Sequence, residues 1–141
     1  MLVETTVLGS VEVDSGDIFD MPEGLYGFGG AGRFALVKKQ EDDVTLMWYQ
    51  ALDHRVPCFI VFNPFDIIDG YSPELERGDL KALGCKDASE LSFLVIAVVP
   101  EDIAKITVNL KSPIVINPQN QLARQVILLN KDYPIQFSLV E

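Results

Sequence analysis

The sequence predicts a mostly β fold: a compact antiparallel β-barrel-like or sandwich domain with one or two short helices at about residues 73–84. Runs rich in Val, Ile, Phe and Tyr are separated at short intervals by turn-forming residues, which is typical of all-β sandwiches and barrels. Hydrophobic residues make up 48% of the chain and charged residues 23%, which fits a chain that folds around its own core. The length of 141 residues predicts a single domain over residues 1–141.

Five strands are expected in the first half of the chain. The first contains Gly9 and Ser10, which indicate a tight turn or a bulge. The last is stopped by Asn63-Pro64, because Pro64 lacks a backbone donor and disfavours a helical residue before it. The expected strands are residues 5–13, 17–20, 34–38, 46–52 and 56–62, with a Gly-rich aromatic loop at 21–30 and an acidic turn at 40–43.

One stretch carries helical signals. Ser72 is a candidate N-cap, and Pro73 suits the first helical position. A helix is therefore expected at about 73–84, either continuous or restarting at Asp79, with Gly84 as its C-terminal stop. The Asp87-x-x-Glu90 pattern indicates one further turn.

The second half of the chain is again strand-like. Residues 91–99 are nearly all apolar, which predicts a strand buried on both faces. Pro134 can stand only at the start or edge of a strand, so the final segment is expected at a sheet edge. The expected strands are residues 91–99, 105–111, 114–116, 122–129 and 134–140.

The charge of the chain favours some partners over others. It has 21 acidic and 11 basic residues and a formal net charge of −10. Nucleic-acid affinity depends on Lys and Arg replacing counterions, so direct nucleic-acid binding, including by an OB-fold, is opposed. The negative field would attract a basic protein, although the same charge can serve solubility alone.

Residues that could carry out catalysis or bind a metal or cofactor are sparse. His54 is the one histidine and lies in a charged turn, where it is most simply a solvated residue. Cys58 and Cys85 are interpreted as reduced thiols. The glycines at residues 27–32 lack the Lys-Ser/Thr of a phosphate loop. We therefore expect no metal and no cofactor, and a small hydrolase using Cys58 or the acids at 66–79 is the weaker alternative.

An acidic and aromatic segment is the candidate binding surface. Apolar side chains at Phe65, Ile67, Ile68 and Tyr71 are interspersed with carboxylates, as in many contact patches. The alternative is that these apolar residues are core contacts of a loop, and the sequence leaves both readings open. The candidate protein-binding residues are Phe65, Asp66, Asp69, Tyr71, Glu74 and Glu76.

The sequence offers no sign of export or membrane insertion. Residues 1–13 lack the basic start and the long apolar core of a signal peptide. The longest apolar run, 93–100, is far shorter than the roughly 18 residues of a membrane span. A cytoplasmic location is therefore expected.

Several blocks resemble, in order, those of the FliW family of bacterial flagellar assembly factors. Residues 21–28 (MPEGLYGF) and 34–36 (FAL) are similar to the family segment FPEGLPGF…FAL. The other similar blocks are 59–65 (FIVFNPF) with 71–75 (YSPEL), 94–100 (LVIAVVP), 109–117 (NLKSPIVIN) with 124–128 (RQVIL), and 133–135 (YPI). The resemblance covers almost the whole chain and implies one FliW-like domain over residues 1–141.

The resemblance implies a function without catalysis. Members of the family bind flagellin in a chaperone-like manner and, when free of it, bind and antagonise the RNA-binding translational regulator CsrA, which relieves repression of flagellin translation. The expected partners are therefore flagellin and CsrA, with no small-molecule substrate, no nucleic acid and no membrane. The alternative is an acidic β-barrel interaction module of an unrelated pathway.

Overall fold

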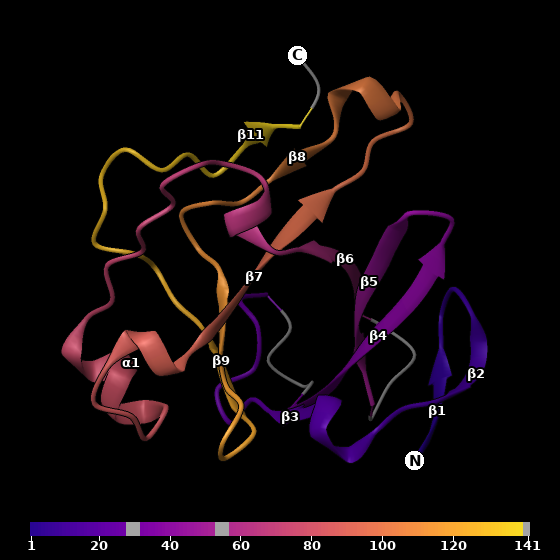
Figure 1. Cartoon of the computed structure of the whole chain (residues 1–141), viewed down its shortest axis with the longest axis horizontal. Helices are drawn as coiled ribbons and strands as arrows, with labels where there is room; N and C mark the ends of the chain where they lie inside the picture. The colour runs from indigo at the N-terminus through magenta and orange to yellow at the C-terminus, as the bar shows by residue number, and fades with distance from the viewer. Residues whose placement is uncertain (28–31, 53–56, 140–141) are drawn as a thin grey trace.

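A closed barrel of seven strands forms the body of the protein (Figure 1). The computed structural model describes residues 1–27, 32–52 and 57–139. Strand β7 pairs with β6 on one side and β9 on the other, and β10 joins β9 to β3, so the sheet returns on itself. The barrel strands are β3 (Ile18–Asp20), β4 (Arg33–Glu41), β5 (Val44–Ala51), β6 (Cys58–Phe62), β7 (Ser92–Val98), β9 (Ile114–Asn117) and β10 (Leu122–Gln125). The predicted mostly β, barrel-like class is confirmed.

The strand pairings are antiparallel with one exception. Leu122 of β10 lies opposite Asp20 of β3 in a parallel pairing. Gln121 supports this junction, because its side-chain amide donates to the carbonyl of Ile18 at 2.8 Å and its own carbonyl accepts from the N–H of Asp20 at 2.9 Å. The barrel therefore closes where segments about a hundred residues apart in the chain meet.

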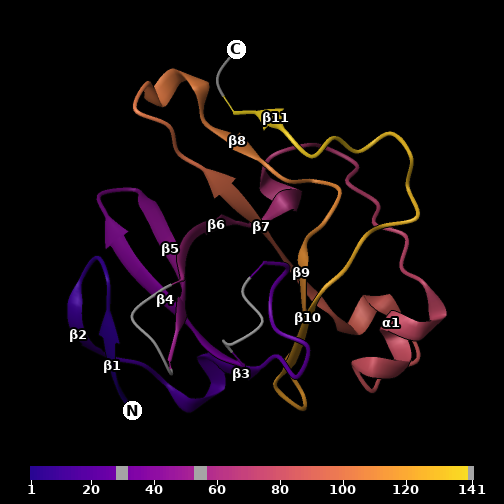
Figure 2. The same ribbon diagram turned by 180° about the vertical axis from the view of Figure 1, so that it is seen from behind.

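Two small pieces of sheet extend from the barrel (Figures 1 and 2). The outer end of β7 pairs with β8 (Thr107–Val108), which in turn pairs with β11 (Phe137–Ser138) at the end of the sheet order. The predicted C-terminal edge strand is thus present but short. A separate hairpin of β1 (Leu2–Thr5) and β2 (Gly9–Glu12) turns at residues 6–8, with Gly9 at φ 69°.

Apolar side chains fill three regions, which explains why the strands read as nearly continuous hydrophobic runs. Inside the barrel, Phe34 stacks on Tyr49 with ring centroids 4.6 Å apart, and the Tyr49 hydroxyl donates to Met21 Sδ at 3.1 Å. Trp48, the neighbour of Tyr49, points to the opposite face and packs under the β1–β2 hairpin. Val95 packs in a third region, between the barrel and the helical segment. Strands buried on both faces need apolar residues at successive positions.

The helix begins later than predicted. Helix α1 (Arg77–Ala82) has Glu76 at its N-cap position, whereas Ser72 was the expected cap. Side chains from the C-terminal part of the chain hold residues 72–76 out of helix: the Tyr133 hydroxyl accepts from the N–H of Ser72 at 2.7 Å, and Asn130 Oδ1 accepts from the N–H of Glu74 at 2.7 Å. Among the described residues, no helix combines the length and apolarity needed to cross a bilayer.

The turns around the helix follow the sequence signals more closely. Gly84 ends α1 at φ 70°, as predicted, and the N–H of Cys85 reaches back to the carbonyl of Leu80 at 3.1 Å. Asp87 accepts from the N–H of Ser89 at 2.9 Å and caps the short 3₁₀ helix η3 (Ala88–Glu90). The remaining 3₁₀ turns are η1 (Ser15–Asp17), η2 (Pro64–Asp66) and η4 (Ile103–Lys105).

Two C-terminal strands are shorter than the sequence pattern suggests. The predicted strand at 105–111 is reduced to β8, because η4 precedes it and Asn109 Oδ1 accepts from the N–H of Ser112 at 2.9 Å to form a turn. The predicted strand at 122–129 ends at Gln125. Beyond it, the N–H groups of Val126 and Leu128 donate to the carbonyls of 113 and 111 without forming a regular ladder.

Candidate protein-binding surface

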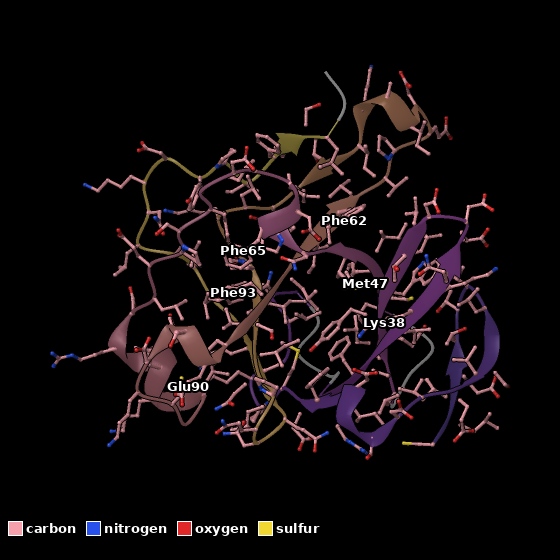
Figure 3. All side chains as sticks on the ribbon, in the orientation of Figure 1. Lys38, Met47, Phe62, Phe65, Glu90 and Phe93 are labelled. Atoms are coloured by element: carbon pink, nitrogen blue, oxygen red, sulfur yellow. The ribbon has the colours of Figure 1, made fainter. Side chains whose placement is uncertain are left out.

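The predicted site segment runs across the outside of the barrel from η2 to α1. Asn63 starts η2, because its Oδ1 accepts from the N–H of Phe65 at 3.0 Å and Pro64 has no donor to lose. This tight turn directs Phe65 outward, where its side chain stays 48% exposed. The ring still packs edge-on against Tyr71 and Phe93, at centroid distances of 5.4 and 5.8 Å (Figure 3). Phe65 is therefore a fixed, half-exposed aromatic surface.

Tyr71 lies in the core beneath that surface. It is only 5% exposed, and its hydroxyl donates to the carbonyl of Leu110 at 2.8 Å. Its ring also packs against Tyr133 at 4.7 Å. Burial, followed by the neighbouring Tyr133, raises the pKa of Tyr71 above its usual range. Of the two readings left open by the sequence, the core contact describes Tyr71, whereas Phe65 is half exposed and stays a candidate for contact with a partner.

The four candidate acids lie at the surface but do not converge. Asp66 and Asp69 are exposed on either side of the turn after η2, Glu74 is exposed beside Asn130, and Glu76 is exposed at the start of α1. Across residues 1–27, 32–52 and 57–139, no group of three or more His, Cys, Asp or Glu is arranged to hold a metal ion. The acids form a charged strip along the segment and no common pocket.

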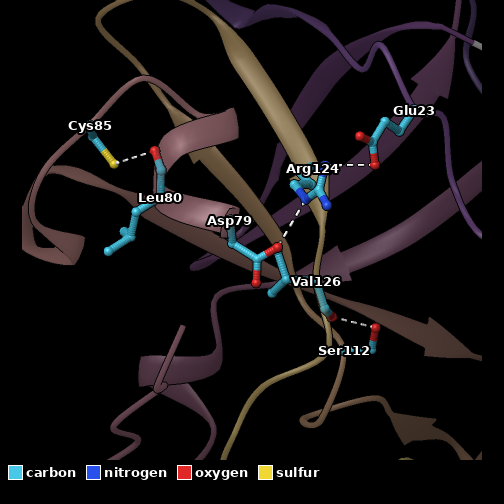
Figure 4. A network of polar contacts seen from close by, with 7 residues as sticks. All are labelled: Glu23, Asp79, Leu80, Cys85, Ser112, Arg124 and Val126. Carbon is cyan, nitrogen blue, oxygen red and sulfur yellow. Dashed lines mark hydrogen bonds and ion pairs between the residues drawn. The ribbon is translucent and has the colours of Figure 1, made fainter. Parts of the chain in front are cut away.

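Asp79, which the sequence grouped with these acids, is removed from the strip by an ion pair (Figure 4). Its Oδ1 lies 2.9 Å from Nε of Arg124 on β10, and Glu23 Oε2 lies 2.6 Å from Nη1 of the same guanidinium. The hydrogen bonds that the guanidinium donates to Glu23 and then to Asp79 raise the pKa of Arg124, although burial acts against them. Arg124 thereby ties α1 and the loop after β3 to the barrel wall.

A groove opens beside Asp66, and no sequence signal indicated it. Its volume is about 520 Å³, and its floor is formed by Met47 of β5, Phe62 of β6 and Ile67 after η2. Figure 3 shows Met47 and Phe62 next to each other where β5 and β6 diverge. The remaining lining residues are Thr45, Asn63, Asp66, Phe137, Ser138 and Leu139. The groove thus combines an apolar floor, a carboxylate at its rim and a C-terminal wall.

The cysteines offer little chemistry. Cys58 and Cys85 are free, as predicted, and both are partly buried, which raises the pKa of both thiols. A raised pKa leaves less of the nucleophilic thiolate at neutral pH. His54, which was expected to be a solvated residue in a charged turn, lies outside the described residues, as do positions 28–31 of the Gly-rich loop.

The fold and the surface together define a small acidic β-barrel whose candidate binding features include a half-exposed aromatic residue, a strip of carboxylates and a groove with apolar lining residues. The FliW protein family model matches residues 2–139, so the chain belongs to the FliW family. It is 35% identical over 141 residues to the flagellar assembly factor FliW of Ruminiclostridium cellulolyticum, covering 100% of this chain and 95% of the relative. It is 33% identical to the flagellar assembly factor FliW of Thermoanaerobacter pseudethanolicus, covering 100% of this chain and 94% of the relative.

A solved structure agrees with this assignment. The crystal structure of a flagellar assembly factor FliW superposes with a TM-score of 0.86 at 26% sequence identity, covering 100% of this chain and 98% of that chain. The predicted family resemblance is confirmed, and the barrel described above is similar to the fold of that solved family member.

Proposed function

We propose that this protein acts in flagellar assembly by binding flagellin in the cytoplasm as a chaperone-like partner. When flagellin is exported, the freed protein binds CsrA, antagonises it and relieves repression of flagellin translation. The observation that carries the proposal is the match to flagellar assembly factors over the full chain, in sequence and in fold. The action is binding alone, with no cofactor and no small-molecule substrate.

The chemistry of the exposed side chains supports a role in binding another protein. A half-exposed Phe65 ring in a segment that also exposes four carboxylates offers both apolar and charged contacts to a protein partner. The net charge of −10 complements a basic partner such as an RNA-binding regulator. The same negative field repels RNA, so a docked complex would disfavour RNA on the adjoining surface of CsrA.

A competition experiment tests the proposal. The purified chain is titrated by calorimetry with CsrA from the same organism, first alone and then after saturation with flagellin. The expected result is binding to each protein separately and loss of the CsrA signal when flagellin is present. Restoration of translation from a CsrA-repressed flagellin leader, in a purified translation system, measures the second step. A chain that binds neither protein would falsify the proposal.

A further inference from the structure

One half of β5 has a strand on only one of its edges. Strand β4 pairs with β5 along its whole length, whereas β6 pairs only with Trp48–Gln50 of β5. Beyond that point β6 pairs with β7, with Val61 opposite Ile96. Among the strands in the described part of the chain, none pairs with the second edge of residues 44–47.

The backbone on that edge faces the groove. The N–H of Ala51 donates toward the β6 side, to the carbonyl of Pro57 at 3.0 Å. Backbone groups alternate between the two sides of a strand, so those of Met47 and Thr45 point to the same side as those of Ala51. Thr45 and Met47 are also groove-lining residues. A strand edge therefore borders an apolar groove, and this combination favours addition of a peptide strand.

The charges around the groove select the kind of segment. Asp66 stands exposed at its rim, and the exposed Asp42 and Asp43 form the turn that precedes the open edge. Glu41, beside that turn, is already paired with Lys39 at 2.9 Å. The floor offers side chains such as Phe62 and Ile67. An occupant therefore needs apolar residues toward the floor and basic residues at its ends.

We propose that the groove binds an extended segment of a partner protein, which adds to the open edge of β5 as a strand. Its alternate side chains are apolar and enter the groove, and Lys or Arg residues flank them. Residues 44–47 span about 13 Å at about 3.3 Å per residue, so about four residues of the segment pair with β5. This inference rests on the proposed function, since it assigns a place to one of the partners named there.

Two pairs of variants test the groove, and each pair has equal charge change. Thr45→Arg fills the groove, whereas Val44→Arg places the same side chain on the opposite face of the strand. Asp66→Lys reverses the rim charge, whereas Asp14→Lys reverses an exposed acid that lies neither in the groove nor in the candidate binding segment. Binding is measured by calorimetry with purified flagellin and purified CsrA. For the partner that uses the groove, we expect Thr45→Arg and Asp66→Lys to weaken binding about tenfold, and the two controls less than about twofold.

Hydrogen exchange tests strand addition without any variant. In the complex, the amides of Thr45 and Met47 should exchange at least about tenfold more slowly than in the free protein. The amides of Val44 and Leu46, which face β4, serve as internal controls because their exchange should change little. Exchange at Thr45 and Met47 that stays unchanged in the complex overturns strand addition.

The outcomes separate this inference from the proposed function. If the wild-type chain binds a partner and all four variants bind it equally well, the groove is not the binding site and the proposed function stands. If the groove variants and the controls weaken binding of the partner equally, the effect is general charge repulsion, and again the groove is not the binding site. If the wild-type chain binds neither flagellin nor CsrA, the proposed function fails and the inference fails with it. Unfolding temperatures of the variants, measured first, establish that each is folded.

Discussion

Two aromatic residues six positions apart, Phe65 and Tyr71, have different roles in the same acidic segment. Tyr71 occupies the core because its hydroxyl finds the carbonyl of Leu110 and its ring finds Tyr133. Phe65 has no polar group to satisfy and remains half exposed on top of Tyr71. Substitutions at these two positions should therefore report on different properties: stability at Tyr71 and, under the proposed function, partner contact at Phe65.

Replacing Tyr71 by Phe tests this division. The change removes the donor to the buried Leu110 carbonyl while keeping the ring, so the free energy of unfolding should fall by about 1–2 kcal/mol. Tyr26→Phe is the matched control, because Tyr26 is 59% exposed and should change stability by less than about 0.5 kcal/mol. Urea unfolding measures both. Equal stabilities for the two variants would contradict the core role of Tyr71.

At the scale of elements, the two glycines of the helical region have opposite requirements. Gly84 has φ 70°, and a Cβ added there would lie 2.9 Å from Asn120 Nδ2, which donates to the carbonyl of Leu83. Gly78 lies inside α1, and a Cβ added there meets nothing within 4 Å. The first glycine is needed by its turn, whereas the second only costs helix stability.

Alanine substitutions at these two positions should therefore change stability in opposite directions. Gly84→Ala is expected to lower the free energy of unfolding by about 1–2 kcal/mol, because Ala is strained at positive φ and crowds Asn120. Gly78→Ala is expected to raise it by about 0.5–1 kcal/mol, since Ala is the better helix former. Thermal and urea unfolding measure both. A stabilising Gly84→Ala would show that the turn tolerates a side chain and that its glycine is not required.

Local sequence signals predicted those elements that are determined by residues within or next to the element itself. The strand at 92–98 and the stop at Gly84 follow from the run of residues around each. The start of α1 could not be predicted in this way. Ser72 and Pro73 are a good local start, but Asn130 and Tyr133 bind the backbone there from 56 to 61 residues away in the chain. Tertiary hydrogen bonds outweighed a preference worth about 1 kcal/mol.

At the scale of the whole molecule, the way the strands pair creates the groove beside Asp66. Met47, Phe62 and Phe137 meet at one groove because β6 leaves β5 for β7 and β11 returns at the end of the chain. The sequence marked each of these residues only as an apolar position in a strand. It did identify Asp66 and Phe65, which lie beside or near the groove, because local composition reveals charged and aromatic segments. A groove made by strand pairing has no such local signature.

The net charge is also a property of the whole molecule, and it predicts how fast a basic partner associates. With a charge of −10, the association rate with CsrA should fall about tenfold between 0.05 and 0.5 M salt, while the dissociation rate changes less. Salt shortens the screening length from about 14 Å to about 4 Å over that range, so only contacts at close range persist. Stopped-flow fluorescence measures both rates.

A pair of double variants locates the source of this steering. Asp42→Asn with Asp43→Asn removes two charges at the turn beside the groove, at the far end of β4. Asp14→Asn with Asp17→Asn removes two charges before β3, which pairs with the opposite end of β4. If the partner approaches the groove, the first variant should slow association at low salt about threefold more than the second. Equal slowing would assign the effect to net charge alone, and an association rate independent of salt would rule out electrostatic steering by this surface.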